Sequence, residues 1–219
     1  MPKTIIEYLH HQAVSKPNDI AFSFLPSKTE PLTELTFREF WSEAISVSNF
    51  LKSKVGVGDK VLLLYPPNID YVVTFYGCLL AGVIAVPAPL PKNNSAQVID
   101  IVNECEPVLV LTTLREVSEI KAFWGKQKRP ISSLNIFTSD NSVSHSGELE
   151  ACLDLDPEAP AFVHYFSDST NINKSITLTH NDVIENVKHL PLMSGERADD
   201  IFVGWLPFFN DMDLIALCS

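Results

Sequence analysis

A polar stretch near the carboxyl end of the sequence carries the side chains best suited to chemistry. Residues 165–175 read Tyr-Phe-Ser-Asp-Ser-Thr-Asn-Ile-Asn-Lys-Ser, and Thr179 and His180 follow shortly after. The stretch joins two predicted strands, 161–165 and 176–179. Taken by themselves, Ser, Thr, Asn and Asp clustered between strands indicate an ordinary polar hairpin connection. Taken alone, the stretch therefore favours such a connection, although hydroxyls and a lysine are also groups that meet phosphate oxygens.

The cysteines and histidines do not have the spacing of a metal site. The four cysteines are widely separated, with no CxxC pair and no histidine at ligand spacing, and we expect buried free thiols. These cysteines are Cys78, Cys105, Cys152 and Cys218. His10 and His11 lie on a predicted amphipathic helix without a carboxylate or cysteine partner, so a surface position is expected. Of the others, His180 is expected near a helix start, and His145, His164 and His189 have no catalytic-triad context.

Charge and composition exclude two classes of partner. The formal net charge of the 219 residues is -11, with a pI near 4.9, so nucleic acid and anionic membrane surfaces are repelled. A hydrophobic content of 46% is ample for a buried core. The amino terminus enters an amphipathic pattern directly and lacks the charged and apolar regions of a secretory signal, which predicts a cytoplasmic location.

The amino-terminal pattern predicts two helices around a short strand. Apolar residues recur at helical spacing from Thr4 to Lys16, where Pro17 follows, and a strand is predicted over 21–25. Thr36 and Glu39 have the spacing of a capping box. An apolar face from Phe40 to Leu51 continues from it, which predicts a second helix.

The middle of the sequence alternates between strand and helix patterns. Residues 61–65 form an unbroken apolar run, typical of a strand that is buried on both faces. Further strands are predicted at 83–86, 108–111 and 134–137, and helices at 69–81, 96–105 and 114–124. This order indicates an α/β fold with a doubly wound, mostly parallel sheet flanked by helices.

The chain is predicted to divide near residue 160. The polar, acidic segment 139–160 is interpreted as a surface connection. We therefore expect an α/β subdomain over 1–160 and the start of a second part over 161–219, with a helix from Asn181 or Asp182.

Residues 71–90 contain no charged side chain and are long enough to span a bilayer. Gly82, Pro87 and Pro89 divide this run into a helix and a short strand, while Gly77 and Ala81 suit close packing of the helix on a sheet. A buried helix–strand unit is therefore favoured over a membrane span.

Two stretches, 65–71 and 75–88, resemble the amino-terminal domain of fatty acyl-AMP ligases. The first reads Tyr-Pro-Pro-Asn-Ile-Asp-Tyr, and the second runs from Phe75 through Gly-Cys-Leu-Leu-Ala-Gly to Ala88. No side chain in them is suited to acid–base or nucleophilic work. The resemblance thus implies the amino-terminal part of the adenylate-forming enzyme fold and assigns no catalyst.

The polar stretch at 165–175 is similar to the adenylate-forming signature Tyr-Thr-Ser-Gly-Ser-Thr-Gly-x-Pro-Lys-Gly, which ends in Thr-His. In that family the loop holds the phosphates of ATP. The resemblance implies that the phosphate-binding residues here are Ser167, Ser169, Thr170 and Lys174.

The same loop departs from the signature at all of its glycines and at its proline. Asp168, Asn171 and Ser175 replace three glycines, and Asn173 replaces the proline. Asp168 opposes a polyanion or pairs with Lys174. Asn171 tolerates left-handed backbone, whereas Ser175 does so only at a cost. We expect the shape of the loop to persist and its affinity for ATP to fall.

Residues 204–215 resemble a third family segment, Trp-Leu-Pro-x-x-His-Asp-Met-Gly-Leu-Ile, which borders the acyl and adenylate pocket. The resemblance implies a substrate pocket that includes Trp205, Pro207, Asn210, Asp211 and Met212. The histidine has become Asn210, which carries no proton or positive charge, and a glycine has become Asp213.

The resemblance implies a reaction in which ATP and a fatty acid, with magnesium, give an acyl adenylate whose acyl group passes to a carrier protein. The family's later segments and its carboxy-terminal catalytic lysine lie beyond this sequence, and we expect a protein partner or self-association to cover the end of the chain. Two hypotheses follow: a degenerate, non-catalytic binding or regulatory module, which is favoured, or one piece of a working ligase. No catalytic or metal-binding residue is assigned.

Overall fold

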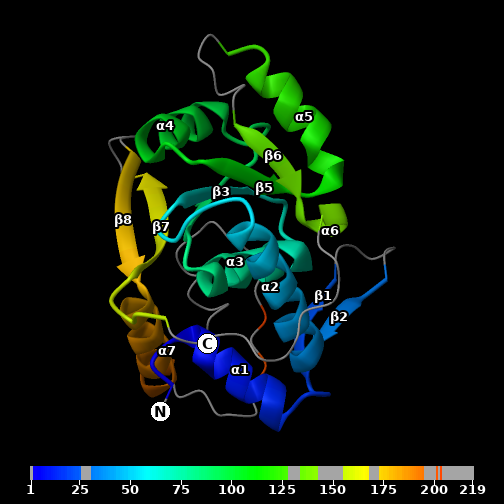
Figure 1. The fold of residues 1–219 in the computed structure, drawn as a ribbon, viewed down its shortest axis with the longest axis vertical. Helices are drawn as coiled ribbons and strands as arrows, with labels where there is room; N and C mark the ends of the chain where they lie inside the picture. The colour runs from blue at the N-terminus through cyan, green and yellow to red at the C-terminus, as the bar shows by residue number, and fades with distance from the viewer. Residues whose placement is uncertain are drawn as a thin grey trace.

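A sheet of six strands forms the centre of the computed structural model, which describes residues 2–25, 31–127, 134–142, 155–167 and 173–194 and the single positions 201 and 203. Neighbouring strands pair parallel except for the last two, which are antiparallel. In spatial order the strands are β6 (Asn135–Thr138), β5 (Leu109–Thr112), β3 (Lys60–Leu64), β4 (Ile84–Ala88), β7 (Pro160–Ser167) and β8 (Asn173–Thr179). The prediction of a mostly parallel sheet is confirmed (Figure 1).

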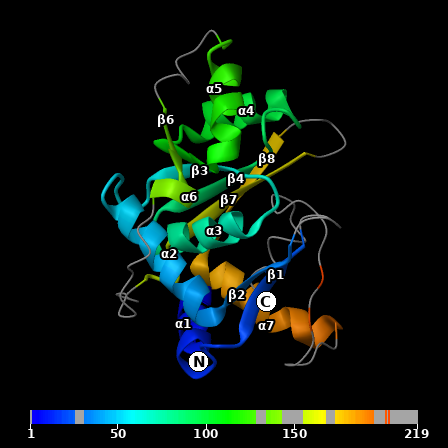
Figure 2. The same ribbon diagram turned by 90° about the vertical axis from the view of Figure 1, so that its right-hand side faces the viewer.

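Helices cover both faces of the sheet, as expected for a doubly wound fold (Figures 1 and 2). One face packs against α1 (Ile5–Ser15), α2 (Phe37–Lys52), α3 (Ile69–Ala81) and α7 (His180–Ser194). The other face packs against α4 (Ser95–Cys105) and α5 (Leu114–Trp124). The short α6 (Ser139–Ser142) follows β6 directly.

Strand β3 explains why its sequence is apolar without alternation. Leu63 belongs to the core on the α3 side, whereas Leu62 and Leu64 belong to the core on the α4 side. All three side chains are fully buried. From Val61 to Leu64, successive residues therefore face one and then the other of two hydrophobic cores, which is the arrangement that the unbroken run predicted.

The strand pair β1 (Ile20–Phe24) and β2 (Thr33–Thr36) forms a separate antiparallel sheet. The sequence predicted the first strand but not the second. Strand β2 has four residues, of which only Leu35 is buried. A segment that short and polar gives no periodic hydrophobic signal.

The capping box at the start of α2 is present as predicted. Thr36 Oγ1 accepts a hydrogen bond from the Glu39 amide at 3.3 Å, and Glu39 Oε2 accepts one from the Thr36 amide at 2.9 Å. These bonds satisfy amide groups that have no partner inside the helix. They also lower the pKa of Glu39, because the backbone bond to Thr36 favours the charged carboxylate.

Replacing Thr36 with alanine is expected to lower the free energy of unfolding by about 1 kcal/mol, the usual value of an N-cap. Thr33 provides a matched control, because it is an exposed threonine in the same strand and does not cap a helix. Urea unfolding of T36A and T33A tests this difference. Equal losses in the two variants would contradict the role of the cap.

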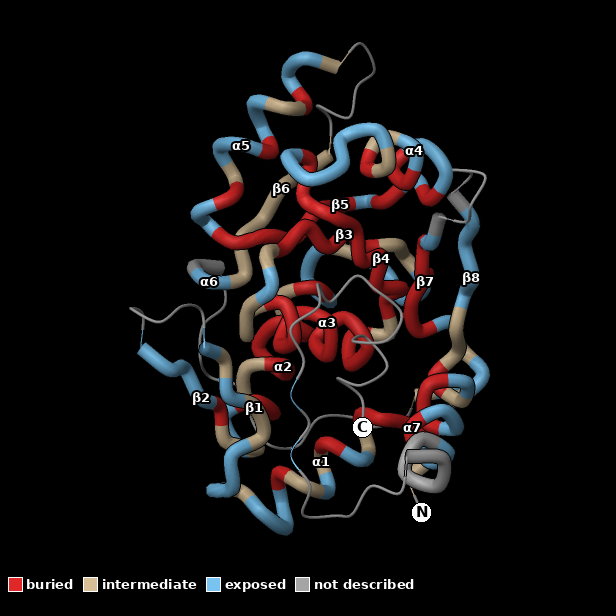
Figure 3. The backbone as a smooth tube through the Cα atoms, turned by 180° about the vertical axis from the view of Figure 1, so that it is seen from behind, coloured by how far each residue is buried: buried red, intermediate tan, exposed pale blue. Residues whose placement is uncertain are grey.

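The uncharged run at 71–90 forms a buried helix–strand unit, α3 followed by β4. Every residue of α3 from Tyr71 to Ala81 is buried, as the tube in Figure 3 shows. Gly82 ends the helix with a φ of 72°, a left-handed conformation that glycine adopts without strain. None of the helices in the described part of the chain is long and apolar enough to cross a bilayer.

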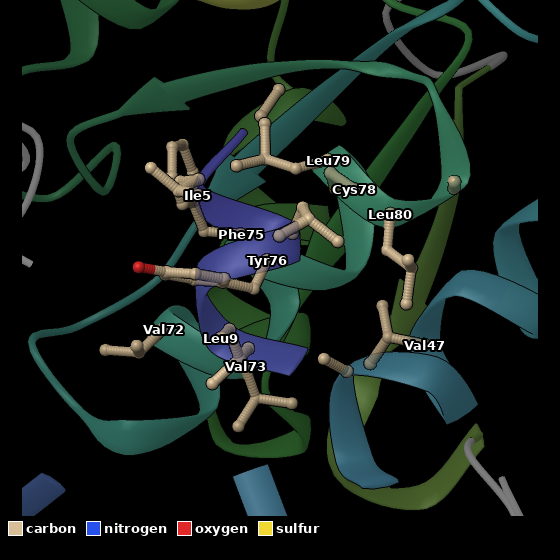
Figure 4. Close-up of a cluster of buried hydrophobic side chains, with 14 of the residues drawn as sticks. Ile5, Leu9, Val47, Val72, Val73, Phe75, Tyr76, Cys78, Leu79 and Leu80 are labelled. Atoms are coloured by element: carbon tan, nitrogen blue, oxygen red, sulfur yellow. The ribbon is translucent and has the colours of Figure 1, made fainter. Parts of the chain in front are cut away.

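Gly77 lies where α3 and α2 approach each other closely. A Cβ atom at this position would stand 2.5 Å from Cβ and Cγ1 of Val47 in α2. Side chains of α1, α2 and α3 converge in this region (Figure 4). The prediction that Gly77 allows close packing of its helix is thus confirmed, but the element packed against it is helix α2 and not the sheet.

Candidate functional site

The polar stretch predicted to bind phosphate lies at the end of the β7–β8 hairpin. The last pairs of the ladder are Tyr165 with Ser175, Phe166 with Lys174, and Ser167 with Asn173. The polar loop therefore joins two strands, as predicted, and the hairpin belongs to the same sheet as β3–β6. Residues 168–172 lie outside the described residues.

The structure places two of the predicted site residues. The backbone of Ser167 ends β7, and Lys174 is an exposed residue at the start of β8. Ser167 and Lys174 belong to neighbouring residue pairs of the β7–β8 ladder. Lys174 is the second residue of β8, the strand that follows the loop. The other predicted site residues lie outside the described residues, namely Ser169, Thr170, Trp205, Pro207, Asn210, Asp211 and Met212.

The two faces of β8 meet different surroundings. Leu178 packs against the core on the α3 side, and Lys174 shares its face because strand side chains alternate. Ser175 lies on the opposite face and contacts α4. Lys174 and Ser175, which are neighbours in the signature, therefore point to opposite sides of the hairpin.

Ser175 does not occupy a left-handed turn, and that expectation is wrong. It lies inside β8, paired with Tyr165. Among the described residues, Glu106 is the non-glycine residue with a positive φ. Replacing a signature glycine by serine thus strains no backbone at position 175. The replacement instead adds a hydroxyl, which donates a hydrogen bond of 2.8 Å to Glu104 Oε1 in α4.

Tyr165 completes this contact on the α4 side of the hairpin. Its side chain is buried in the core on the α4 side, and Tyr165 pairs with Ser175 across the ladder. Burial raises the pKa of Tyr165 well above its usual value, so the hydroxyl stays protonated. Sequence reasoning missed Glu104, because 71 residues separate it from Ser175 and no local pattern links them.

The other end of β8 leads into α7 through a second capping box. Asp182 Oδ2 accepts hydrogen bonds from the amide and the hydroxyl of Thr179, both at 2.8 Å, and Thr179 Oγ1 accepts one from the Asp182 amide at 3.0 Å. His180 begins the helix and is 2% exposed. Its Nδ1 atom has no hydrogen-bond partner among the described residues.

The stability of the protein is expected to fall between neutral and mildly acidic pH because of His180. Burial lowers the pKa of this histidine, an effect that the nearby Asp156 opposes in part. The unfolded chain takes up a proton near pH 6.5, whereas the folded chain resists it to lower pH. Stability is therefore complete above about pH 6.5 and declines below it, with a slope of at most about 1.4 kcal/mol per pH unit.

The variant H180N lacks the titrating ring and tests this origin. Urea unfolding at pH 7.5 and 5.5 should show a smaller loss in H180N than in the unaltered chain. The variant H189N is the control, since His189 is an exposed residue of the same helix. If H180N and the unaltered chain lose the same free energy, His180 does not cause the decline.

The cysteines and carboxylates of the described residues form no metal centre. Cys78 and Cys105 are free and buried, and burial raises the pKa of the Cys105 thiol to about 12. Within the described ranges, no three His, Cys, Asp or Glu side chains gather closely enough to hold a metal ion. Of the described side chains at the hairpin tip, Lys174 has the chemistry that suits a triphosphate.

The family model for AMP-binding enzymes matches residues 9–219 of the chain. The chain belongs to this family. The AMP-binding match includes the two strands of the hairpin and the helix that follows them. The resemblance at 165–180 therefore belongs to a match that extends along nearly the whole chain. The amino-terminal part of the adenylate-forming fold is thereby established.

Two curated relatives of this AMP-binding chain are fatty-acid ligases by name. A medium-chain fatty-acid–acyl-carrier-protein ligase, JamA from Moorena producens, is 25% identical over 97% of the chain and 37% of the relative. A long-chain fatty-acid–AMP ligase, FadD26 from Mycobacterium marinum, is 30% identical over 99% of the chain and 39% of the relative. The chain therefore spans less than two fifths of the length of these relatives.

Solved structures share the fold of the AMP-binding chain. The fatty acyl-adenylate ligase of Legionella pneumophila, solved with acyl adenylate and pyrophosphate, has a TM-score of 0.84 and 24% identity. It is matched over 100% of this chain and 38% of its own. A complex of McyG with phenylalanyl-adenylate has a TM-score of 0.85 at 18% identity, over 97% of this chain and 34% of its own.

Proposed function

We propose that this chain is a fatty acyl-AMP ligase-like module that binds Mg-ATP weakly and does not adenylate fatty acids by itself. The observation that carries the proposal is the phosphate loop, in which Asp168 and Asn171 stand where the signature has glycine. The loop sits at the tip of a formed hairpin whose lysine is exposed. The strands that flank the loop are thus formed, and the feature that departs from the signature is the side-chain chemistry of the loop.

The charge of Asp168 is the strongest element of this argument. Two like charges about 4 Å apart repel by about 1 kcal/mol in water and about 4 kcal/mol at an effective dielectric constant near 20. A triphosphate carries several negative charges, and the protein already has a formal net charge of -11. Because catalysis of this kind depends on preorganised phosphate contacts, weak nucleotide binding also removes the reaction.

Acyl-adenylate formation by the purified chain tests the catalytic part of the proposal. Fatty acids of several lengths are supplied with Mg-ATP, and the release of pyrophosphate and the acyl adenylate are measured. The Legionella pneumophila enzyme serves as the positive control. We expect no product above background from the chain alone. Acyl adenylate at a rate comparable to the control would overturn the proposal.

A second candidate function is a piece of a working ligase that is completed by other segments. Four loop residues of the signature favour it, because their hydroxyls and ammonium group suit phosphate oxygens: Ser167, Ser169, Thr170 and Lys174. This candidate predicts that the chain gains adenylation activity when it is expressed with the sequence that follows it in its genome. No activity in that setting would exclude it.

The partners that we propose are a fatty acid and an acyl-carrier protein. The relative JamA carries both in its name, and this chain shares 25% identity with it. We also propose that a protein partner or a second copy of the chain binds to it. The oligomeric state of the purified protein tests the second of these alternatives. We propose that magnesium binds together with ATP. A cytoplasmic location is proposed from the sequence.

A further inference from the structure

The base of the β7–β8 hairpin is closed by a turn, residues 156–159, that lies on the start of α7. This turn precedes β7, whose first residue pairs with the last residue of β8. The amide of His180 donates a hydrogen bond of 3.2 Å to the carbonyl of Ala159, and the amide of Asn181 donates one of 2.7 Å to the carbonyl of Pro157. The helix that follows the hairpin therefore holds the turn that leads into it.

The imidazole of His180 lies in surroundings that favour its neutral form. The side chain is 2% exposed, and its Nδ1 atom has no hydrogen-bond partner among the described residues. A protonated imidazole carries an N–H on both ring nitrogens, so the proton on Nδ1 would lack an acceptor from those residues. His180 is also the first residue of α7, and the amino end of a helix carries a partial positive charge. All three features oppose a charge on the buried ring.

Carboxylates on three neighbouring elements bear on the charge of this ring. Asp156 and Glu158 belong to the turn, and Asp156 Oδ1 accepts a hydrogen bond of 3.0 Å from the Glu158 amide. Asp182, in the first turn of α7, has its carboxylate engaged in the capping box. In α1, which packs beside α7, the acidic residue of the first turn is Glu7. Burial of the His180 ring lowers its pKa more than the charge of Asp156 raises it.

We propose that His180 is a proton-sensitive latch at the base of the hairpin. While the imidazole is neutral, it stays buried and the turn 156–159 lies on α7. When the ring takes up a proton, it leaves its buried position, and the two amide bonds to the turn open. The opening is local, because it involves one short turn and the first residues of one helix. It is therefore a different event from the global unfolding whose free energy declines with pH.

Hydrogen exchange of the His180 and Asn181 amides, measured by NMR on the full chain, tests the latch. An exposed histidine titrates near pH 6.5 and the buried ring at lower pH, so the open state gains population on acidification. Between pH 7.5 and 5.5, and after correction for intrinsic exchange, both amides should exchange at least about twofold and up to about tenfold faster. Low urea should leave their exchange unchanged. Exchange that is independent of pH, or that rises with urea as steeply as that of α3, would overturn the latch.

Three variants assign the proton to His180. H180N has no titrating ring at this position and should lose the pH dependence of both amides. D156N removes the neighbouring carboxylate but keeps an oxygen that accepts the Glu158 amide, and it should retain the dependence. H189N, altered at an exposed histidine of the same helix, should match the unaltered chain. A dependence that persists in H180N, or that disappears in D156N, would show that another group drives the opening. If H180N does not fold, the unaltered chain and D156N decide the question.

Discussion

Replacing Gly77 with alanine is expected to destabilise the protein by about 3 kcal/mol, at the upper end of the cost of overpacking a core. The added Cβ would lie 2.5 Å from two atoms of Val47 and 3.2 Å from the carbonyl oxygen of Ala44. The Val47 contact involves Cβ itself, so a change of rotamer does not relieve it. Helices α2 and α3 must move apart, which opens the core that both share with α1. Urea unfolding measures the loss.

Two further variants separate this clash from the general effect of the substitution. The double variant G77A/V47A removes the obstructing side chain and should recover part of the lost stability. Gly125 is a control, because it has a right-handed φ of -60° and a Cβ there would stay 3.4 Å from its nearest neighbour. G125A should change stability by less than about 1 kcal/mol. Similar losses in G77A and G125A would contradict the packing argument.

The variant D168G/N171G is expected to bind Mg-ATP at least about tenfold more tightly than the unaltered chain, which corresponds to about 1.4 kcal/mol. Removing Asp168 eliminates a negative charge from the proposed phosphate loop, and glycine at both positions would let the main chain approach the phosphates. Ser175 is left in place because its backbone is a regular strand. Titration calorimetry measures the affinity.

The gain should depend on Lys174. In the background of D168G/N171G, the further change K174A removes the ammonium group that meets the phosphate oxygens. We expect this triple variant to lose most of the recovered affinity. A gain that persists without Lys174 would place the nucleotide elsewhere.

The sequence predicted the elements that depend on local signals. The capping box of Thr36 and Glu39, the apolar run of β3 and the glycine end of α3 each rest on neighbouring residues, and the structure contains all three. The core of the sheet follows from the same patterns, because an apolar run predicts burial on both faces.

Features that depend on distant residues were not predictable from one sequence. The bond between Ser175 and Glu104 spans 71 residues, and the partner of Gly77 lies in another helix. The signature suggested backbone strain at Ser175, but the structure gives this residue an extended strand and a side-chain contact. The predicted pocket residues from Trp205 to Met212 stay a prediction, because they lie outside the described residues.

Titration of the unaltered chain with Mg-ATP tests the central proposal most directly. Asp168 and the missing glycines of the proposed phosphate loop should leave no saturable heat below about 1 mM nucleotide. The acyl-adenylate ligase of Legionella pneumophila, measured in parallel, shows that the assay detects binding. Saturation of the unaltered chain at micromolar Mg-ATP would contradict the account.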